Sequence, residues 1–347
     1  MKTSLRYTIL WCNSMQLLGE AFVLSPPSFS SPLSSVRDIW RLAAHPSEFN
    51  SKYDKNESLP TEVDIVVIGS GVAGLSCASL LSHCSSSLND VLVLESHDTV
   101  GGAAHGWSRR GFHFESGPSL YSGFSMERSS NPLKNIFQVV GNEPDWITYD
   151  RWGTVLPNGK KFAAKIGPEG LKGVMEEHGG PGANEEFSAL MKRMEPLGNA
   201  AQALTSMALR EDAGALATLG LRYPKELLQT LAQGQTLNEP FLNIMEEMSL
   251  QNKFVINWLD MLCFLLQGLP AAGTMNAVIA YMLADWYRPG VTLDFPRGGS
   301  GAIVAGLARA VEEKGGGRVV TNAHVQHILV KDNRACGVEL KDGTVIH

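Results

Sequence analysis

The residues of this chain best suited to chemistry are three closely spaced glycines and one acidic residue that follows them. Gly69, Gly71 and Gly74 form a complete G-x-G-x-x-G motif, and Glu95 comes 21 residues after the third glycine. In such a motif the first glycine permits a tight turn, the second lets the backbone approach a pyrophosphate, and the third lets a helix pack closely on a strand. A carboxylate at the position of Glu95 would accept hydrogen bonds from ribose hydroxyls and would disfavour a ribose 2′-phosphate.

The motif lies between patterns that predict a strand, a helix and a second strand. Residues 63–68 are rich in β-branched residues and predict a buried parallel strand, residues 72–83 predict a helix, and residues 91–94 predict a strand ending at Glu95. The free N–H groups at the start of the helix would bind phosphate. The unit predicts an α/β, Rossmann-type dinucleotide-binding domain, and a glycine-rich turn in an unrelated α/β protein is the alternative. The residues expected around the pyrophosphate are Gly69, Ser70, Gly71, Val72, Ala73 and Gly74.

A glycine pair after the acidic residue favours FAD as the dinucleotide. Gly101 and Gly102 begin six residues after Glu95, and small residues there would let the loop approach the cofactor. The pair resembles the second signature of the FAD-binding flavoproteins that include amine oxidases and phytoene desaturases. Residues 111–123 are similar to the stretch of that family that reaches toward the flavin. These resemblances favour FAD over NAD.

Two stretches, residues 63–123 and 285–345, resemble the carotenoid isomerase, phytoene desaturase and retinol saturase group of flavoproteins. The second contains Asp-Phe-Pro-Arg-Gly-Gly-Ser-Gly at residues 294–301 and a predicted helix over residues 302–314. The resemblance implies that the chain returns there from the substrate domain to the FAD domain, and that the backbone of Val325 contacts the adenine. Residues 334–346 predict a strand pair with an Asp-Gly turn at 342–343.

The sequence departs from this group in two places. Ala103, Ala104 and His105 follow the glycine pair where many relatives carry an arginine. The chain also stops at His347, whereas relatives continue well beyond this point to a glycine-rich segment that closes over the flavin. The chain is therefore expected to be a fragment or the product of a truncated gene model, with an incomplete second part of the FAD domain.

The middle of the chain, residues 151–290, is expected to form a largely helical substrate domain. Nine of the 12 methionines lie between Met175 and Met282, which ordinary helical core accounts for, and which also suits a long apolar ligand. The apolar stretch 254–286 is interrupted by charged residues and proline, so peripheral membrane docking is compatible with it and a spanning helix is not expected. Helical patterns separated by Gly and Pro breaks cover residues 185–193, 200–210, 224–233, 240–250 and 254–266.

Composition argues against several other classes of protein. The net charge of −6, the pI near 5.9 and the lack of a basic stripe exclude a nucleic-acid partner. The five cysteines form neither a C-x-x-C pair nor a zinc spacing, which predicts free thiols and no metal site.

The first 58 residues are expected to lie outside the fold, as a targeting presequence or a disordered segment. Lys2 and Arg6 precede an apolar run over residues 7–18 that is too short and too polar to span a bilayer. The Ala-Phe junction at 21–22 and the Ser/Pro-rich residues 24–32 resemble the bipartite plastid presequence of algae with secondary plastids. We therefore expect a plastid protein, with a mitochondrial or a cytoplasmic location as the alternatives.

These features predict an FAD-binding domain in two parts, residues 59–150 and 291–347, on either side of the substrate domain. The predicted function is that of an FAD-dependent oxidoreductase or isomerase acting on carotenoids or related polyenes, in carotenoid biosynthesis. The alternatives are a flavin amine oxidase and a non-catalytic, lipid-binding escort protein of the same fold. No catalytic residue is assigned, because in such flavoenzymes the cofactor carries the chemistry.

Overall fold

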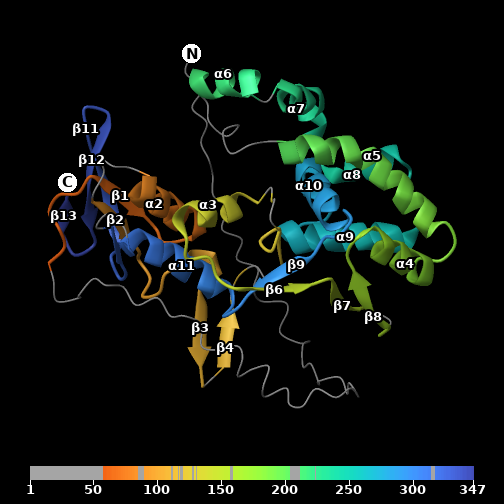
Figure 1. The fold of residues 1–347 in the computed structure, drawn as a ribbon, viewed down its shortest axis with the longest axis horizontal. Coiled ribbons are helices and arrows are strands. Elements are labelled where there is room, and N and C mark those ends of the chain that lie inside the picture. Colours follow the sequence, from red (N-terminus) through yellow and green to blue (C-terminus); the bar gives the residue numbers. More distant parts are fainter. Residues whose placement is uncertain are drawn as a thin grey trace. The chain divides into compact units, whose positions relative to one another are not determined.

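The computed structural model describes 11 stretches of the chain, all within the compact unit Ala43–His347 (Figure 1). The presequence predicted for residues 1–58 lies outside these stretches except for its last residue. The described residues are 58–84, 90–110, 112–115, 117, 120–126, 129, 131–156, 159–203, 212–222, 224–313 and 317–347.

A three-stranded parallel sheet forms the centre of the nucleotide-binding part. Its order is β1 (Ile65–Ile68), β2 (Val91–Leu94) and β10 (Arg318–Val320). All four residues of β2 are buried, as a central strand requires. The strand predicted for residues 63–68 is confirmed as β1, but its predicted burial is wrong, since Ile68 is 49% exposed. In the described part of the chain β1 is an edge strand that pairs with β2 alone, which leaves its other edge uncovered.

Successive side chains of a strand point to opposite faces of the sheet, and each face of this sheet is covered by a different layer. Val91 and Val93 belong to a core shared with α2 (Val72–Cys84) and α11 (Ser300–Glu313). Leu92 and Leu94 belong to a second core, shared with the antiparallel sheet β11 (Val325–Lys331), β12 (Arg334–Leu340) and β13 (Val345–Ile346). The helices predicted for residues 72–83 and 302–314 are thus confirmed, and the second begins two residues earlier than predicted.

The predicted strand pair over residues 334–346 is also confirmed. Val338 of β12 lies opposite Ile346 of β13, and Gly343 in the connecting turn has φ +87°. The β11–β12 connection is a second tight turn, in which Asp332 and Asn333 both have positive φ, the geometry that suits a two-residue hairpin.

Short strands after Gly102 link segments that are distant in sequence. The sheet β5–β9–β6 joins Tyr121–Ser122, Leu293–Pro296 and Trp146–Tyr149, so β9 lies between two strands from the first half of the chain. The other small elements are η1 (Gly102–Ala104), the hairpin β3 (Gly106–Arg109) and β4 (Phe112–Glu115), α3 (Pro132–Val140), and the pair β7 (Arg151–Val155) and β8 (Lys161–Lys165).

The middle of the chain is helical, as predicted. The stretch 204–211, which includes most of the helix predicted for residues 200–210, lies outside the described residues. Among the described residues no helix combines the length and the apolar character needed to cross a bilayer. The helices are α4 (Pro168–His178), α5 (Ala183–Ala203), α6 (Ala213–Arg222), α7 (Pro224–Leu237), α8 (Phe241–Glu247), α9 (Lys253–Gln267) and α10 (Asn276–Trp286).

The predicted break between the first two helical patterns is wrong, because α5 continues through Pro196 and Gly198. A Cβ atom on Gly198 would lie 2.8 Å from the Ala284 Cβ and 3.1 Å from the Ala280 carbonyl oxygen. At Gly198, α5 therefore lies too close to α10 for a larger side chain. Packing between the two helices outweighs the low helix propensity of glycine.

Replacing Gly198 with valine is expected to lower the free energy of unfolding by about 1–3 kcal/mol, the usual cost of overfilling a packed interface. Urea unfolding followed by circular dichroism measures it. The matched control is Gly173→Val in α4, where the glycine is exposed and an added Cβ would meet nothing within 4 Å. Equal stabilities of the two variants would show that the α5–α10 contact does not need a glycine.

Candidate functional site

The G-x-G-x-x-G segment forms the turn between β1 and α2. Gly69 has φ +95°, a conformation that favours glycine, and its N–H donates to the Leu94 carbonyl oxygen at 2.8 Å. A Cβ on Gly74 would lie 2.1 Å from the carbonyl oxygen of Gly69. The first and third glycines therefore shape the turn and the approach of the helix to the strand.

Gly71 has a different environment from the other two glycines of the motif. A Cβ atom there would meet no described atom within 4 Å, and its φ lies outside the left-handed region. The fold of the described residues therefore does not require glycine at this position. What glycine provides is open space beside the first N–H groups of α2, where a phosphate group can approach the backbone. This space fits the pyrophosphate of a dinucleotide.

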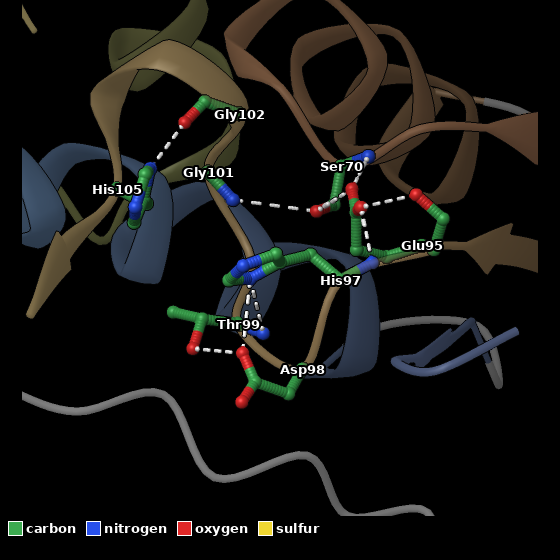
Figure 2. A network of polar contacts seen from close by, with 9 residues as sticks. Ser70, Glu95, His97, Asp98, Thr99, Gly101, Gly102 and His105 are labelled. Atoms are coloured by element: carbon green, nitrogen blue, oxygen red, sulfur yellow. Dashed lines mark hydrogen bonds and ion pairs between the residues drawn. The ribbon is translucent and has the colours of Figure 1, made fainter. Parts of the chain in front are cut away.

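The predicted glycine pair lies directly against this turn. Gly71 and Gly101 form a parallel bridge, and the Gly101 N–H donates to the Ser70 carbonyl oxygen at 3.0 Å and to the Ser70 hydroxyl at 3.3 Å (Figure 2). A Cβ on Gly102 would lie 3.1 Å from the Gly71 Cα. Both glycines of the pair have positive φ, 126° and 55°. Two sequence signatures separated by a strand and a helix thus meet in one place.

Glu95 is buried at the end of β2, and four donors surround its carboxylate (Figure 2). Oε2 accepts the Ser70 N–H at 2.8 Å and the Ser70 hydroxyl at 2.6 Å. Oε1 accepts the His97 N–H at 2.8 Å and the Ser96 hydroxyl at 3.4 Å. Burial raises the pKa of Glu95, but the hydrogen bonds from Ser70, His97 and Ser96 together outweigh it, so the pKa lies below its ordinary value.

This arrangement gives the carboxylate two kinds of partner. The N–H groups of Ser70 and His97 belong to the backbone and hold the carboxylate in place. The two serine hydroxyls can rotate away, so ribose hydroxyls can take their positions without moving the backbone. Sequence reasoning placed Ser70 beside the pyrophosphate but did not predict its two hydrogen bonds to Glu95. The signal that it missed is a hydroxyl residue in the turn that lies next to the acidic residue at the end of the strand.

Val325, the remaining predicted site residue, is the first residue of β11. The backbone just before it is hydrogen-bonded to the segment that begins at Glu95. The Ala323 N–H donates to the Glu95 carbonyl oxygen at 2.8 Å, and the Asn322 N–H donates to the His97 carbonyl oxygen at 2.9 Å. Val325 is half-buried against the core that contains Leu94. The structure thus brings the start of β11 to the carboxyl end of β2, where the adenosine half of a dinucleotide would lie.

The lowered pKa of Glu95 predicts a loss of stability in acid. Above the ordinary glutamate pKa of 4.5 the carboxylate is ionised in both the folded and the unfolded chain, and its contribution is fully present. As the pH falls toward the lower folded-state pKa, the unfolded chain binds the proton first, so the folded state loses this contribution. Urea unfolding from about pH 7 to pH 3 should therefore show a steeper loss for the wild type than for Glu95→Ala. If stability fell equally with pH in the two proteins, the hydrogen bonds assigned to the Glu95 carboxylate would be contradicted.

Where the sequence has Ala103, Ala104 and His105 after the glycine pair, the structure places η1 and the start of β3. The His105 Nδ1 atom lies 2.7 Å from the Gly102 carbonyl oxygen, so the imidazole N–H can bind the loop that it follows. Farther along, the Glu115 carboxylate accepts the Ser300 N–H at 2.8 Å at the start of α11, and the Tyr121 hydroxyl donates to the Ser300 hydroxyl at 2.9 Å. An acidic group at a helix N-terminus is electrostatically favourable, so this contact fixes α11 against β4 and β5.

A cavity of about 200 Å³ is lined by β5, the segment leading into α3, and helices α9 and α10. Sequence reasoning did not find it, because its lining comes from segments more than a hundred residues apart. Within the described residues no cluster of His, Cys, Asp and Glu side chains could hold a metal ion. The four described cysteines, Cys77, Cys84, Cys263 and Cys336, are free thiols.

Comparison with known proteins adds relatives at both the sequence and the structure level. Residues 72–347 match the family described as flavin containing amine oxidoreductase. All-trans-retinol 13,14-reductase of Macaca fascicularis is 27% identical over 313 residues, which cover 82% of this chain and 45% of the relative. Chloroplastic prolycopene isomerase of Daucus carota is 26% identical over 296 residues, with coverage of 82% and 45%. The chain thus spans less than half the length of these two relatives.

Solved structures share the fold at low sequence identity. Putrescine oxidase bound to putrescine is 17% identical with a TM-score of 0.53, covering 83% of this chain and 57% of the oxidase. An oxidoreductase from Methanosarcina mazei is 17% identical with a TM-score of 0.52, covering 80% of this chain and 56% of that structure.

Proposed function

Because the chain belongs to the flavin-containing amine oxidoreductase family, we propose that it is an FAD-dependent oxidoreductase or isomerase acting on the double bonds of a polyene. Membership of this family confirms the predicted cofactor, FAD, and the predicted α/β flavoprotein fold. The predicted resemblance to carotenoid isomerases and retinol saturases is confirmed by the two relatives above.

The observation that carries the cofactor site is the open space at Gly71 beside the start of α2. In this proposal the turn from Gly69 to Gly74 binds the pyrophosphate, with Gly101 and Gly102 close to it. Glu95 accepts the ribose hydroxyls, and the Val325 backbone contacts the adenine. When bound, FAD supplies hydride and electron transfer, which the described side chains do not provide by themselves. The chain's own residues bind and orient it.

A polyene substrate is supported by the names of the relatives, a retinol reductase and a prolycopene isomerase. The test has two steps. Denaturing the purified protein should release FAD in a near-stoichiometric amount, and the native protein should convert an added polyene under reducing conditions. Recovery of NAD in place of FAD would overturn the cofactor assignment. Polyene binding without any FAD would instead fit the escort-protein alternative.

We also propose that residues 1–58 direct the protein to a plastid, where it associates peripherally with membrane to reach a lipid-soluble substrate. The Ser/Pro-rich segment and the chloroplastic names of the plant relatives support this location. Fusing residues 1–60 to a fluorescent protein in an alga with a secondary plastid should place the fluorescence in the plastid. A mitochondrial signal would refute the plastid location, and a cytosolic signal would refute targeting altogether.

A further inference from the structure

The cavity beside β5 combines an apolar wall with a small set of polar groups. Leu120, Leu266, Met282 and Trp286 supply apolar surface, and Ser122, Ser129, Asn131 and Asp285 supply polar atoms. A volume of about 200 Å³ is below the usual range for a whole drug-sized ligand, about 300–1,000 Å³. The cavity therefore suits one end of a longer molecule.

Asp285 is the charged residue among those that line this cavity. It is 8% exposed, and the Arg288 Nε–H donates to its Oδ1 at 3.1 Å. The Ser122 hydroxyl donates to its Oδ2 through a short hydrogen bond. The Ser122 carbonyl in turn accepts the Asn131 side-chain N–H at 3.0 Å, and Asn131 caps α3. The carboxylate is thus held by Ser122 of β5 and by Arg288 just after α10, and the start of α3 holds Ser122 in turn.

A ligand hydroxyl matches the hydrogen-bonding capacity that Asp285 and Ser129 still have. Two ionised oxygens can accept about four hydrogen bonds, and the described contacts to Asp285 use two of them. The Ser129 hydroxyl accepts the Asn131 N–H at 3.0 Å, so it can still donate its proton. An alcohol could therefore donate to Asp285 and accept from Ser129.

The charges in the cavity disfavour the two other candidate end groups. Arg288 already compensates the charge of Asp285, so an ammonium group gains little net attraction. A hydrocarbon end would cover the acceptors of Asp285 without giving them a donor, which is costly in a buried site. Sites built to bind a substrate hydroxyl reject analogues that lack it strongly.

We propose that this cavity binds the terminal hydroxyl of an isoprenoid alcohol, with Asp285 as acceptor and Ser129 as donor. The inference rests on the proposed function for the polyene chain and adds the nature of its end group. Asp285 and Ser129 distinguish an alcohol from a hydrocarbon, and the apolar wall accommodates the carbons next to the hydroxyl. The rest of the chain extends out of the cavity.

Tryptophan fluorescence gives the test its readout, because energy transfer from the seven tryptophans, which include the cavity residue Trp286, to a bound retinoid reports binding without turnover. The probes are all-trans-retinol, the corresponding hydrocarbon and the corresponding primary amine, titrated into the full 347-residue protein. We expect retinol to bind about tenfold or more tightly than either analogue. Asp285→Leu should bring the alcohol-to-hydrocarbon ratio close to one, and Ser129→Ala should reduce it. Asp150→Leu, which breaks an exposed Asp–Arg pair outside the cavity, should leave it unchanged.

Several outcomes would overturn the proposal. Equal binding of retinol and the hydrocarbon, tighter binding of the amine, or no binding of any probe would each do so. If Asp285→Leu does not fold, Ser129→Ala still decides, since an unchanged ratio there contradicts the assigned donor. FAD content is measured on the same samples, and its absence would count against the proposed function alone. The ratios of probe affinities test the cavity independently of FAD binding, because none of the lining residues belongs to the turn from Gly69 to Gly74.

Discussion

Replacing Gly71 with valine is expected to abolish FAD binding while leaving the protein folded. The added side chain would meet no described protein atom within 4 Å at its Cβ, so the fold has no steric reason to change. The same side chain would fill the space that the pyrophosphate needs beside the first N–H groups of α2. We expect affinity to fall about 100-fold or more, which corresponds to at least about 2.7 kcal/mol. Equilibrium titration with FAD, followed by flavin fluorescence, measures the change.

Two glycine variants separate this effect from damage to the fold. Gly153→Val in β7 also places its Cβ in open space but lies outside the turn, and it should bind FAD normally. Gly74→Val would bring its Cβ to 2.1 Å from the Gly69 carbonyl oxygen, so it should unfold at lower urea concentration. Gly71→Val should be as stable as Gly153→Val. Unlike the wild type and Gly153→Val, it should not bind FAD. Tight FAD binding by Gly71→Val would show that the pyrophosphate lies elsewhere.

The sequence was sufficient to predict the nucleotide-binding unit because each of its features is local. A run of β-branched residues, a glycine turn and an apolar helix pattern are contained in residues 63–84, and the structure has β1 and α2 there. The Asp342-Gly343 turn is equally local, since it depends on one glycine with positive φ. The exposed edge of β1 could not be predicted, because burial depends on which strands pair with it.

Features that depend on distant partners were not predictable in the same way. Strands β5 and β9 are only two and four residues long, and they form a sheet because residues 121–122 meet residues 293–294. From the sequence, Gly198 predicts a helix break, because its packing against α10 is not visible there. The cavity at Asp285 depends on the same long-range contacts, and its key hydrogen bond joins residues 163 positions apart.

Replacing Glu95 with alanine is expected to weaken FAD binding by about 10- to 150-fold. The ribose hydroxyls would lose a charged acceptor, a loss of about 1.5–3 kcal/mol for a hydrogen bond of this kind. The structure adds a second consequence, because the N–H groups of Ser70 and His97 would lose their acceptor as well. The variant should therefore also be less stable than the wild type when no FAD is present. Urea unfolding of the FAD-free proteins and FAD titration measure the two effects separately.

Glu95→Gln tests whether charge or shape matters at the end of β2. The two oxygens of Glu95 accept the backbone N–H groups of Ser70 and His97, but a glutamine amide has only one oxygen. Its NH₂ group would face one of these N–H groups, so a donor would lie against a donor and that hydrogen bond would be lost. We therefore expect Glu95→Gln to bind FAD nearly as weakly as Glu95→Ala. Ser96→Ala removes only the 3.4 Å hydrogen bond and is the matched control, with affinity close to that of the wild type. If Glu95→Ala retained wild-type affinity, the ribose would not bind at the end of β2, and the orientation of FAD proposed above would be wrong.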